Sequence, residues 1–159
     1  MERLNTTSNT NETASEVSEV NKIFVYGTLR KGFYNHHFLE EDTEFIGKAK
    51  SVNEYKMTAR EYIIRGGRKR AVPFVSKTPE CSITGEIYEV SNNTLKLLDR
   101  LENHPFWYVR EEVEFVLTED NTDGEPKVVK AWIYFNELDK GEIDVESGDF
   151  EISFPKKAQ

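Results

Sequence analysis

The chain has 159 residues, a formal net charge of −8, 37% hydrophobic residues and 31% charged residues. This length suits one domain with a hydrophobic core, and the negative charge argues against general nucleic-acid binding, which needs lysine and arginine gathered on one surface. No apolar run approaches the roughly 20 residues that cross a bilayer, and the first residues do not resemble a secretory signal, so we expect a cytoplasmic protein. A single cysteine, Cys81, excludes an internal disulfide and a thiolate metal site.

The first half of the chain predicts a polar tail followed by strands. Residues 1–20 contain almost no large apolar side chains, so they are expected to form a disordered tail. Residues 22–26 are apolar on both faces, which predicts a central strand that breaks at Gly27. A short helix over 35–39 and one or two strands over 44–59 should follow. Residues 61–76 predict a hairpin around Gly66 and Gly67, with Pro73 at an edge or a bulge.

The second half predicts a strand, a helix and a strand pair. A strand over 83–90 should lead into a helix that is capped by Ser91 or Asn92 and ended by Asn103 and Pro105. Strands over 107–117 and 128–135 should pair, and the alternation of apolar side chains at 150, 152 and 154 predicts a final strand or a loosely held tail. The pattern therefore predicts an α+β domain over 21–138, built on a small mixed curved sheet or barrel with two main helices, and a C-terminal extension over 139–159.

Glu102 is the first candidate for chemistry, because it shares the apolar face of its helix with Leu95 and Leu98. Burial and the negative end of the helix dipole would both raise the pKa of this carboxyl, so that it could exchange protons near neutrality. The alternative is a structural salt bridge, for which Arg110 on the next strand is the expected partner.

The turn after the first strand is the second candidate. A glycine at 27 lets the backbone expose several N–H groups in a row, and such a group of donors binds anions. Together with a carboxyl of raised pKa, it would suit a substrate that carries a carboxylate and an amide carbonyl.

A basic cluster and three histidines are the other features that could bind a ligand. The basic cluster of Arg65, Arg68, Lys69 and Arg70 is read as a solvated charged hairpin turn, with an anion site as the alternative. The three histidines are scattered and show no metal-ligand spacing, so no metal site is expected.

Several motifs in this order resemble the γ-glutamyl cyclotransferase superfamily, and the match runs from about Lys22 to Phe135. These motifs are VYGTLRKG at 25–32, Asn35-His36, GEIYEV at 85–90 and LDRLE at 98–102, followed by Pro105, Tyr108 and Arg110. The glycine loop reads Tyr-Gly-Thr-Leu without an inserted Asn, which is similar to the γ-glutamylamine cyclotransferase branch and to AIG2-like proteins. The acidic tail and the basic hairpin have no counterpart in this pattern, which leaves substrate choice open.

The resemblance implies a fold, an activity and a set of site residues. In the family, a γ-glutamyl amine is cyclised to 5-oxoproline when its own α-amino nitrogen attacks the side-chain amide carbon. Glu102 matches the catalytic general acid and base; Tyr26, Gly27, Thr28 and Leu29 match the substrate loop; and Tyr108 and Arg110 match positions next to the site. The implied partner is a small γ-glutamyl substrate, such as γ-glutamyl-ε-lysine, with no metal or organic cofactor and no nucleic acid or membrane, and a monomer is favoured. The alternatives are a protein that binds a small carboxylate or amine without turnover, and a regulatory protein that acts through its tail.

Overall fold

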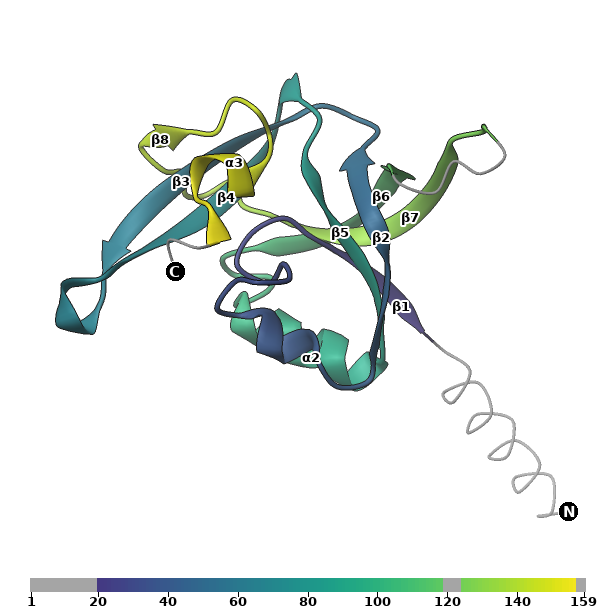
Figure 1. The fold of residues 1–159 in the computed structure, drawn as a ribbon, viewed down its shortest axis with the longest axis horizontal. Coiled ribbons are helices and arrows are strands. Elements are labelled where there is room, and N and C mark those ends of the chain that lie inside the picture. The colour runs from purple at the N-terminus through teal and green to yellow at the C-terminus, as the bar shows by residue number, and fades with distance from the viewer. Residues whose placement is uncertain (1–19, 119–123, 157–159) are drawn as a thin grey trace, which may run out of the picture.

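A computed structural model of the protein describes residues 20–118 and 124–156 (Figure 1). All but the last residue of the expected N-terminal tail lies outside this part of the chain. Five strands close into a barrel in the order β1, β5, β2, β6, β7. Their bounds are β1 Asn21–Val25, β2 Thr43–Ser51, β5 Thr84–Val90, β6 Val109–Leu117 and β7 Lys127–Phe135. A sheet of three strands, in the order β4, β3, β8, lies beside the barrel and consists of β3 Tyr55–Ile63, β4 Lys69–Cys81 and β8 Ile143–Asp144.

Four short helical elements complete the described chain. They are the 3₁₀ helices η1 His36–Leu39 and η2 Arg65–Gly67 and the α-helices α2 Asn92–Leu101 and α3 Phe150–Ser153. The α+β architecture with a small closed barrel, expected from the sequence, is confirmed. Within the described residues no helix is long and apolar enough to cross a membrane.

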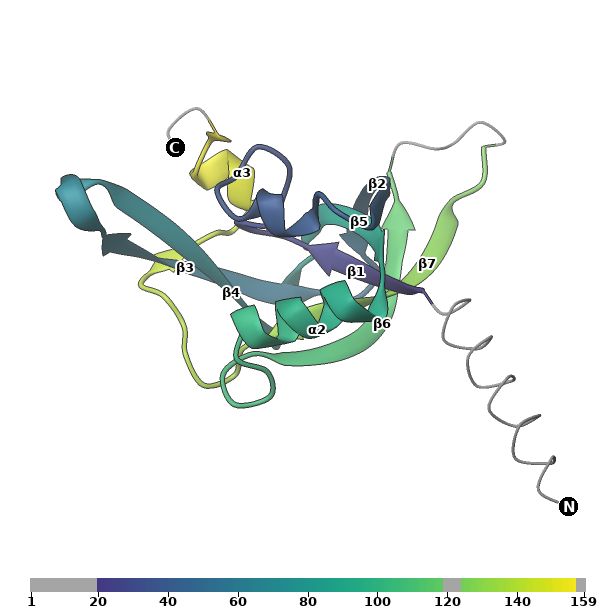
Figure 2. The same cartoon turned by 90° about the horizontal axis from the view of Figure 1, so that it is seen from below.

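The apolar run of β1 serves two cores, one on each side of the strand. Phe24 points into the barrel and stacks on Phe115, with ring centroids 4.1 Å apart. Ile23 and Val25 point outward and belong to a second core, which helix α2 covers. Figure 2 shows α2 lying alongside β1. A strand that is buried on both faces explains why its sequence shows no polar alternation.

Helix α2 begins and ends as its sequence predicts. The Ser91 side chain accepts a hydrogen bond from the N–H of Thr94, which caps the first turn. Asn103 has a φ of 55°, and the N–H groups of 103 and 104 return to the carbonyls of Arg100 and Asp99, which is the Schellman pattern. This ending fixes Glu102 at the C-cap, directly after the last helical residue, Leu101.

The β3–β4 hairpin projects beyond the barrel, as both views show (Figures 1 and 2). Its turn contains Gly66 and Gly67, whose φ angles are 85° and 79°. The hairpin predicted over 61–76 is therefore confirmed, although its strands are longer than predicted. Pro73 lies in β4, an edge strand of the three-stranded sheet, where its missing N–H does not interrupt a ladder.

The final strand predicted around Phe150 is wrong, because residues 150–153 form helix α3. The Asp149 side chain accepts a hydrogen bond from the N–H of Glu151 and caps this helix. Phe150 and Phe154 are four residues apart and meet on one face, with ring centroids 5.0 Å apart. The spacing of four between Phe150 and Phe154 fits a helical turn as well as a strand, whereas Ile152, two residues after Phe150, is left exposed.

Candidate active site

The loop that follows β1 folds back on itself. The N–H of Arg30 donates to the carbonyl of Gly27 at 3.0 Å, and the N–H of Asn35 donates to the carbonyl of Thr28 at 3.0 Å. Within residues 20–118 and 124–156, the N–H groups of Gly27, Thr28 and Leu29 have no acceptor. Three successive main-chain donors are thus available to a bound anion or carbonyl oxygen.

Gly27 is required at this turn for a steric reason. A Cβ atom at this position would lie 2.3 Å from Cγ of Pro73, closer than real Cβ contacts. The φ of Gly27 is outside the left-handed region, so backbone freedom is not what the turn needs. The loop can approach strand β4 closely only because residue 27 has no side chain.

Buried charges anchor this loop to the rest of the fold. The Arg30 side chain is only 3% exposed, and its Nη1 lies 2.9 Å from a carboxylate oxygen of Asp149. Its Nε lies 3.6 Å from Glu86 of β5, and the other oxygen of Glu86 accepts the N–H of Lys31 at 3.0 Å. The loop is therefore tied to the barrel and to the residue that caps α3.

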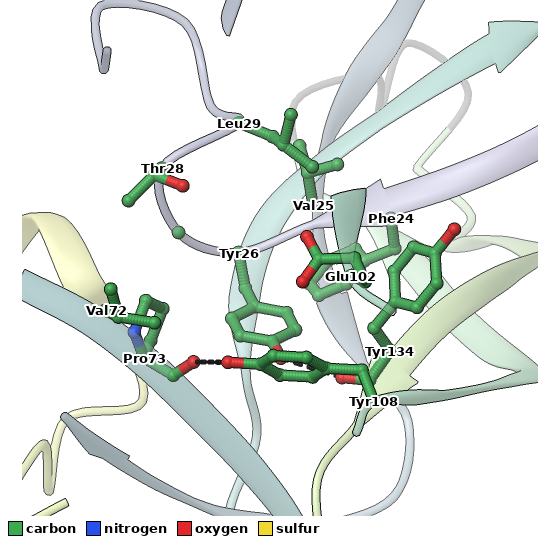
Figure 3. Close-up of a pocket in the computed structure, with 11 residues that line it drawn as sticks. Phe24, Val25, Tyr26, Thr28, Leu29, Val72, Pro73, Glu102, Tyr108 and Tyr134 are labelled. Atoms are coloured by element: carbon green, nitrogen blue, oxygen red, sulfur yellow. Dashed lines mark hydrogen bonds between the residues drawn. The ribbon is translucent and has the colours of Figure 1, made fainter. Parts of the chain in front are cut away.

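Glu102 and the loop line one small cavity (Figure 3). Figure 3 shows the carboxylate of Glu102 pointing toward the bend that carries Thr28 and Leu29. The cavity is lined by Phe24, Val25, Tyr26, Gly27, Thr28, Leu29, Val72, Pro73, Glu102, Tyr108 and Tyr134. The structure thus brings together every residue that the sequence singled out for the site except Arg110.

Burial raises the pKa of the half-buried Glu102 to about 7. No hydrogen-bond donor or cation of the described residues lies within bonding distance of its carboxylate. Its two protonation states are therefore both populated near neutral pH, which is what a group that accepts and returns a proton requires.

The alternative salt bridge between Glu102 and Arg110 is not formed. Arg110 instead makes two hydrogen bonds to Asp99, with Nε and Nη2 each 2.8 Å from a carboxylate oxygen. Burial acts to raise the pKa of Asp99, but hydrogen bonds from Arg110 and Tyr134 outweigh it and hold the pKa below its usual value. Arg110 lies outside the cavity lining and acts on it through Asp99 and Tyr134.

The tyrosines of the cavity use their hydroxyl groups to hold the walls. Tyr26 donates to the carbonyl of Tyr134 at 2.7 Å, and Tyr108 donates to the carbonyl of Pro73 at 2.8 Å. Burial raises the pKa of all three tyrosines, so they stay protonated and donate. Their rings, rather than free hydroxyl groups, face the cavity space.

Three residues of the cavity lining, Val72, Pro73 and Tyr134, were not predicted from the sequence. These residues come from β4 and β7, far along the chain from the loop and from Glu102, and they carry no motif of their own.

No three His, Cys, Asp or Glu side chains of residues 20–118 and 124–156 are grouped so that they could hold a metal ion.

The cavity thus combines a carboxyl whose pKa is near neutrality with main-chain N–H groups that have no acceptor within the described residues. These features make the protein a closed barrel with a candidate acid–base site. Residues 23–152 match the family described as gamma-glutamyl cyclotransferase, AIG2-like, and the chain belongs to that family. The superfamily resemblance seen in the sequence motifs is therefore confirmed.

Relatives and solved structures agree with this assignment. A protein of Methanocaldococcus jannaschii is 40% identical over 129 residues, which cover 80% of this chain and 93% of that protein. Its name describes it as a provisional gamma-glutamylcyclotransferase. The gamma-glutamylaminecyclotransferase of Mus musculus is 32% identical over 120 residues, covering 70% of this chain and 75% of its own. The crystal structure of an AIG2-like protein from Mus musculus superposes with a TM-score of 0.65 at 27% identity, covering 82% of this chain and 89% of that one.

Proposed function

We propose that this protein is a γ-glutamylamine cyclotransferase-like enzyme that converts a γ-glutamyl amine, such as γ-glutamyl-ε-lysine, into 5-oxoproline and the free amine. Membership of the family and the names of its relatives support cyclotransferase activity. The observation that carries the proposal is the position of Glu102, whose carboxyl has a pKa of about 7 and lies in the same cavity as the free N–H groups of the loop.

The reaction needs one group that moves protons. The ionised Glu102 takes a proton from the α-ammonium of the substrate, and the resulting amine attacks the γ-carbonyl carbon to form the new C–N bond. Glu102 then delivers a proton to the leaving nitrogen as the old C–N bond breaks. Overall, two protons pass from the α-nitrogen to the leaving amine, and no water is consumed. General acid–base catalysis of this kind contributes typically ~10²–10⁴ in rate.

The loop stabilises the negative charge that develops in the same step. Attack on the carbonyl produces an oxyanion, and the substrate also carries an α-carboxylate. The N–H groups of Gly27, Thr28 and Leu29 are the donors available for these oxygens. The rings of Tyr26 and Tyr108 and the side chain of Leu29 limit water in the cavity, which strengthens such electrostatic interactions.

Arg110 is assigned an indirect role in this proposal. Because its guanidinium is bound to Asp99, and Asp99 in turn accepts the hydroxyl of Tyr134, it positions a wall of the cavity without touching the substrate.

The test uses the purified full chain with γ-glutamyl-ε-lysine and a panel of other γ-glutamyl amines, with 5-oxoproline and free amine measured as products. We expect the two products in equal amounts, a loss of at least about 100-fold in kcat for Glu102→Gln, and little change for Glu112→Gln, a control acid on the barrel surface. Substrate-dependent thermal stabilisation without any product from the panel would favour the binding protein instead and overturn the catalytic proposal.

A further inference from the structure

A second hollow adjoins the candidate active site and is much larger. The cavity beside Glu102 measures about 50 Å³, whereas this groove measures about 510 Å³. We name it the basic groove; it is lined by Tyr34, Glu61, Arg68, Lys69, Arg70, Ala71, Ser153, Phe154 and Pro155. Its walls are the loop after β1, the β3–β4 hairpin and the end of helix α3.

The basic groove has a surplus of positive charge in a chain whose net charge is −8. Arg68, Lys69 and Arg70 contribute three cations, and Glu61 contributes the one carboxylate of the lining. Within residues 20–118 and 124–156, none of the three cations has an ion-pair partner. Cations gathered in a concave surface without internal partners attract an anion from solution.

Arg70 is held in a position suited to such an anion. Its Cζ lies 3.9 Å from the ring centroid of Tyr34, so the guanidinium is stacked on the ring, and both residues are partly buried. Stacking fixes the plane of the guanidinium, and the N–H edge of a guanidinium matches a carboxylate at two points. Of the three cations, Arg70 is thus the one fixed in orientation before a ligand arrives.

The basic groove and the cavity are lined by neighbouring residues of the same two segments. Arg70 and Val72 belong to β4 and lie on the same side of the strand, about 7 Å apart at roughly 3.3 Å per residue; the first lines the groove and the second lines the cavity. On the opposite wall, Tyr34 lines the groove and Thr28 lines the cavity, and the N–H of Asn35, next to Tyr34, donates to the carbonyl of Thr28 at 3.0 Å. A molecule that is held beside Glu102 and is larger than the cavity can therefore extend into the groove.

We propose that the basic groove is the subsite for the leaving amine and that Arg70, assisted by Arg68 and Lys69, selects γ-glutamyl amines whose leaving part carries a carboxylate or a similar anionic group. This inference rests on the proposed function, because the cavity must first bind the γ-glutamyl half. For Arg68, Lys69 and Arg70 it favours the anion site over the solvated hairpin turn, the two interpretations that the sequence left open. Arg65, at the hairpin tip, does not line the groove.

The experiment compares pairs of substrates that differ only in charge. Each pair is a γ-glutamyl ω-amino acid and its neutral carboxamide, with one to four methylenes between the nitrogen and the carboxyl carbon. For wild type we expect kcat/KM at the best length to be about tenfold or more higher for the acid than for the carboxamide. This preference should shrink as ionic strength rises.

Variants separate the groove from general effects. Arg70→Gln should lower kcat/KM for the acid about tenfold more than for the carboxamide, so that most of the preference is lost, and thermal unfolding like that of wild type would show that the variant is folded. The double change Arg68→Gln, Lys69→Gln should reduce the preference in part. Arg65→Gln is the matched control, because it removes the same charge from the same hairpin outside the groove lining, and the preference should stay.

The outcomes distinguish the two proposals. Turnover of the carboxamides with no preference for the acids, or a preference that Arg70→Gln does not change, overturns the role of the basic groove and leaves the proposed function standing. No 5-oxoproline from the series, with turnover of γ-glutamyl-ε-lysine, also overturns only the role of the basic groove. No 5-oxoproline from the series or from γ-glutamyl-ε-lysine overturns both.

Discussion

Arg110 and Asp99 form a two-point ion pair, with both nitrogen–oxygen distances at 2.8 Å. Asp99 precedes Glu102 by about one helical turn, so the cation that could have neutralised Glu102 is bound elsewhere. The Glu102 carboxyl is left with burial as the influence that raises its pKa to about 7. This separation of two nearby acids, one held ionised and one able to exchange protons, is typical of acid–base sites.

The first prediction concerns the pH dependence of turnover. Because Glu102 must be ionised to accept the proton of the α-ammonium, kcat/KM should rise with pH through an apparent pKa near 7 and level off above it. Initial rates between pH 5 and pH 9 would measure this. A profile already flat above about pH 5 would mean that Glu102 titrates as an ordinary surface acid, and the proposed role would fail.

The second prediction is that Glu102→Gln stabilises the protein at alkaline pH. The pKa of Glu102 is about 7 in the folded state against 4.5 as its ordinary value, so between these limits the folded state binds a proton that the unfolded state does not. The free energy of unfolding of wild type should therefore fall as pH rises from about 4.5 to about 7, by up to about 3 kcal/mol.

Glutamine at this position carries no charge at any pH. Thermal unfolding should show the variant and wild type alike near pH 4 and the variant more stable above pH 7. Equal stability at pH 8 would contradict a buried acid at this position.

The third prediction concerns the ion pair itself. Arg110→Gln leaves the partly buried Asp99 without its cation and should cost about 1–3 kcal/mol at pH 7. Because the folded-state pKa of Asp99 is held below its ordinary value, this stabilisation is present above the ordinary pKa and is lost as pH falls through the folded-state pKa. Denaturant unfolding at pH 7 and at pH 3 should show the difference between wild type and variant shrinking at the lower pH; a constant difference would rule out the electrostatic cause.

The parts of the site that the sequence predicts are those set by local periodicity. Glu102 falls on the buried side of α2 because it follows Leu98 by four residues, and the strand run before Gly27 fixes where the loop begins. The partner of Arg110 was not predictable in the same way. Asp99 and Glu102 are three residues apart on one helix, so both are within reach of the next strand, and the sequence does not show which of them the arginine meets.

The remaining walls depend on tertiary structure. Pro73 and Tyr134 reach the cavity because the hairpin folds over the loop and β7 closes the barrel beside β1, and neither contact follows from spacing along the chain. The signal that could have corrected the C-terminal prediction was present, because Asp149 directly before Phe150 is a favourable N-cap residue.

The fourth prediction tests the contact between the loop and β4. Gly27→Ala would place its Cβ 2.3 Å from Cγ of Pro73, so the loop or the strand must move, and both stability and kcat/KM should fall. Pro73→Ala removes the atoms in conflict and leaves only a Cβ 3.7 Å away, which is an ordinary contact. The double variant should therefore regain activity relative to Gly27→Ala alone; additive losses in the two variants would show that the steric argument is incorrect.

The last prediction concerns the buried charges that anchor the loop. Arg30 and Glu86 have side chains only 3% and 5% exposed, so Arg30→Met would leave a buried carboxylate without its cation. We expect a loss of about 3–5 kcal/mol in the free energy of unfolding, measured with denaturant, together with weaker substrate binding, because the loop loses the contacts of Arg30 with Glu86 and Asp149 and keeps only the bond from the N–H of Lys31 to Glu86. Arg100→Met, at an exposed position of α2, is the control and should change stability by less than about 0.5 kcal/mol.

A second change identifies the cause of that loss. Adding Glu86→Gln to Arg30→Met removes the unpaired charge but keeps an oxygen that can accept the N–H of Lys31. Part of the lost stability should then return, although Asp149 still lacks the hydrogen bond that Arg30 donates. If the double variant is less stable than Arg30→Met, the orphaned charge is not the source of the instability, and the arginine contributes through packing of its aliphatic stem instead.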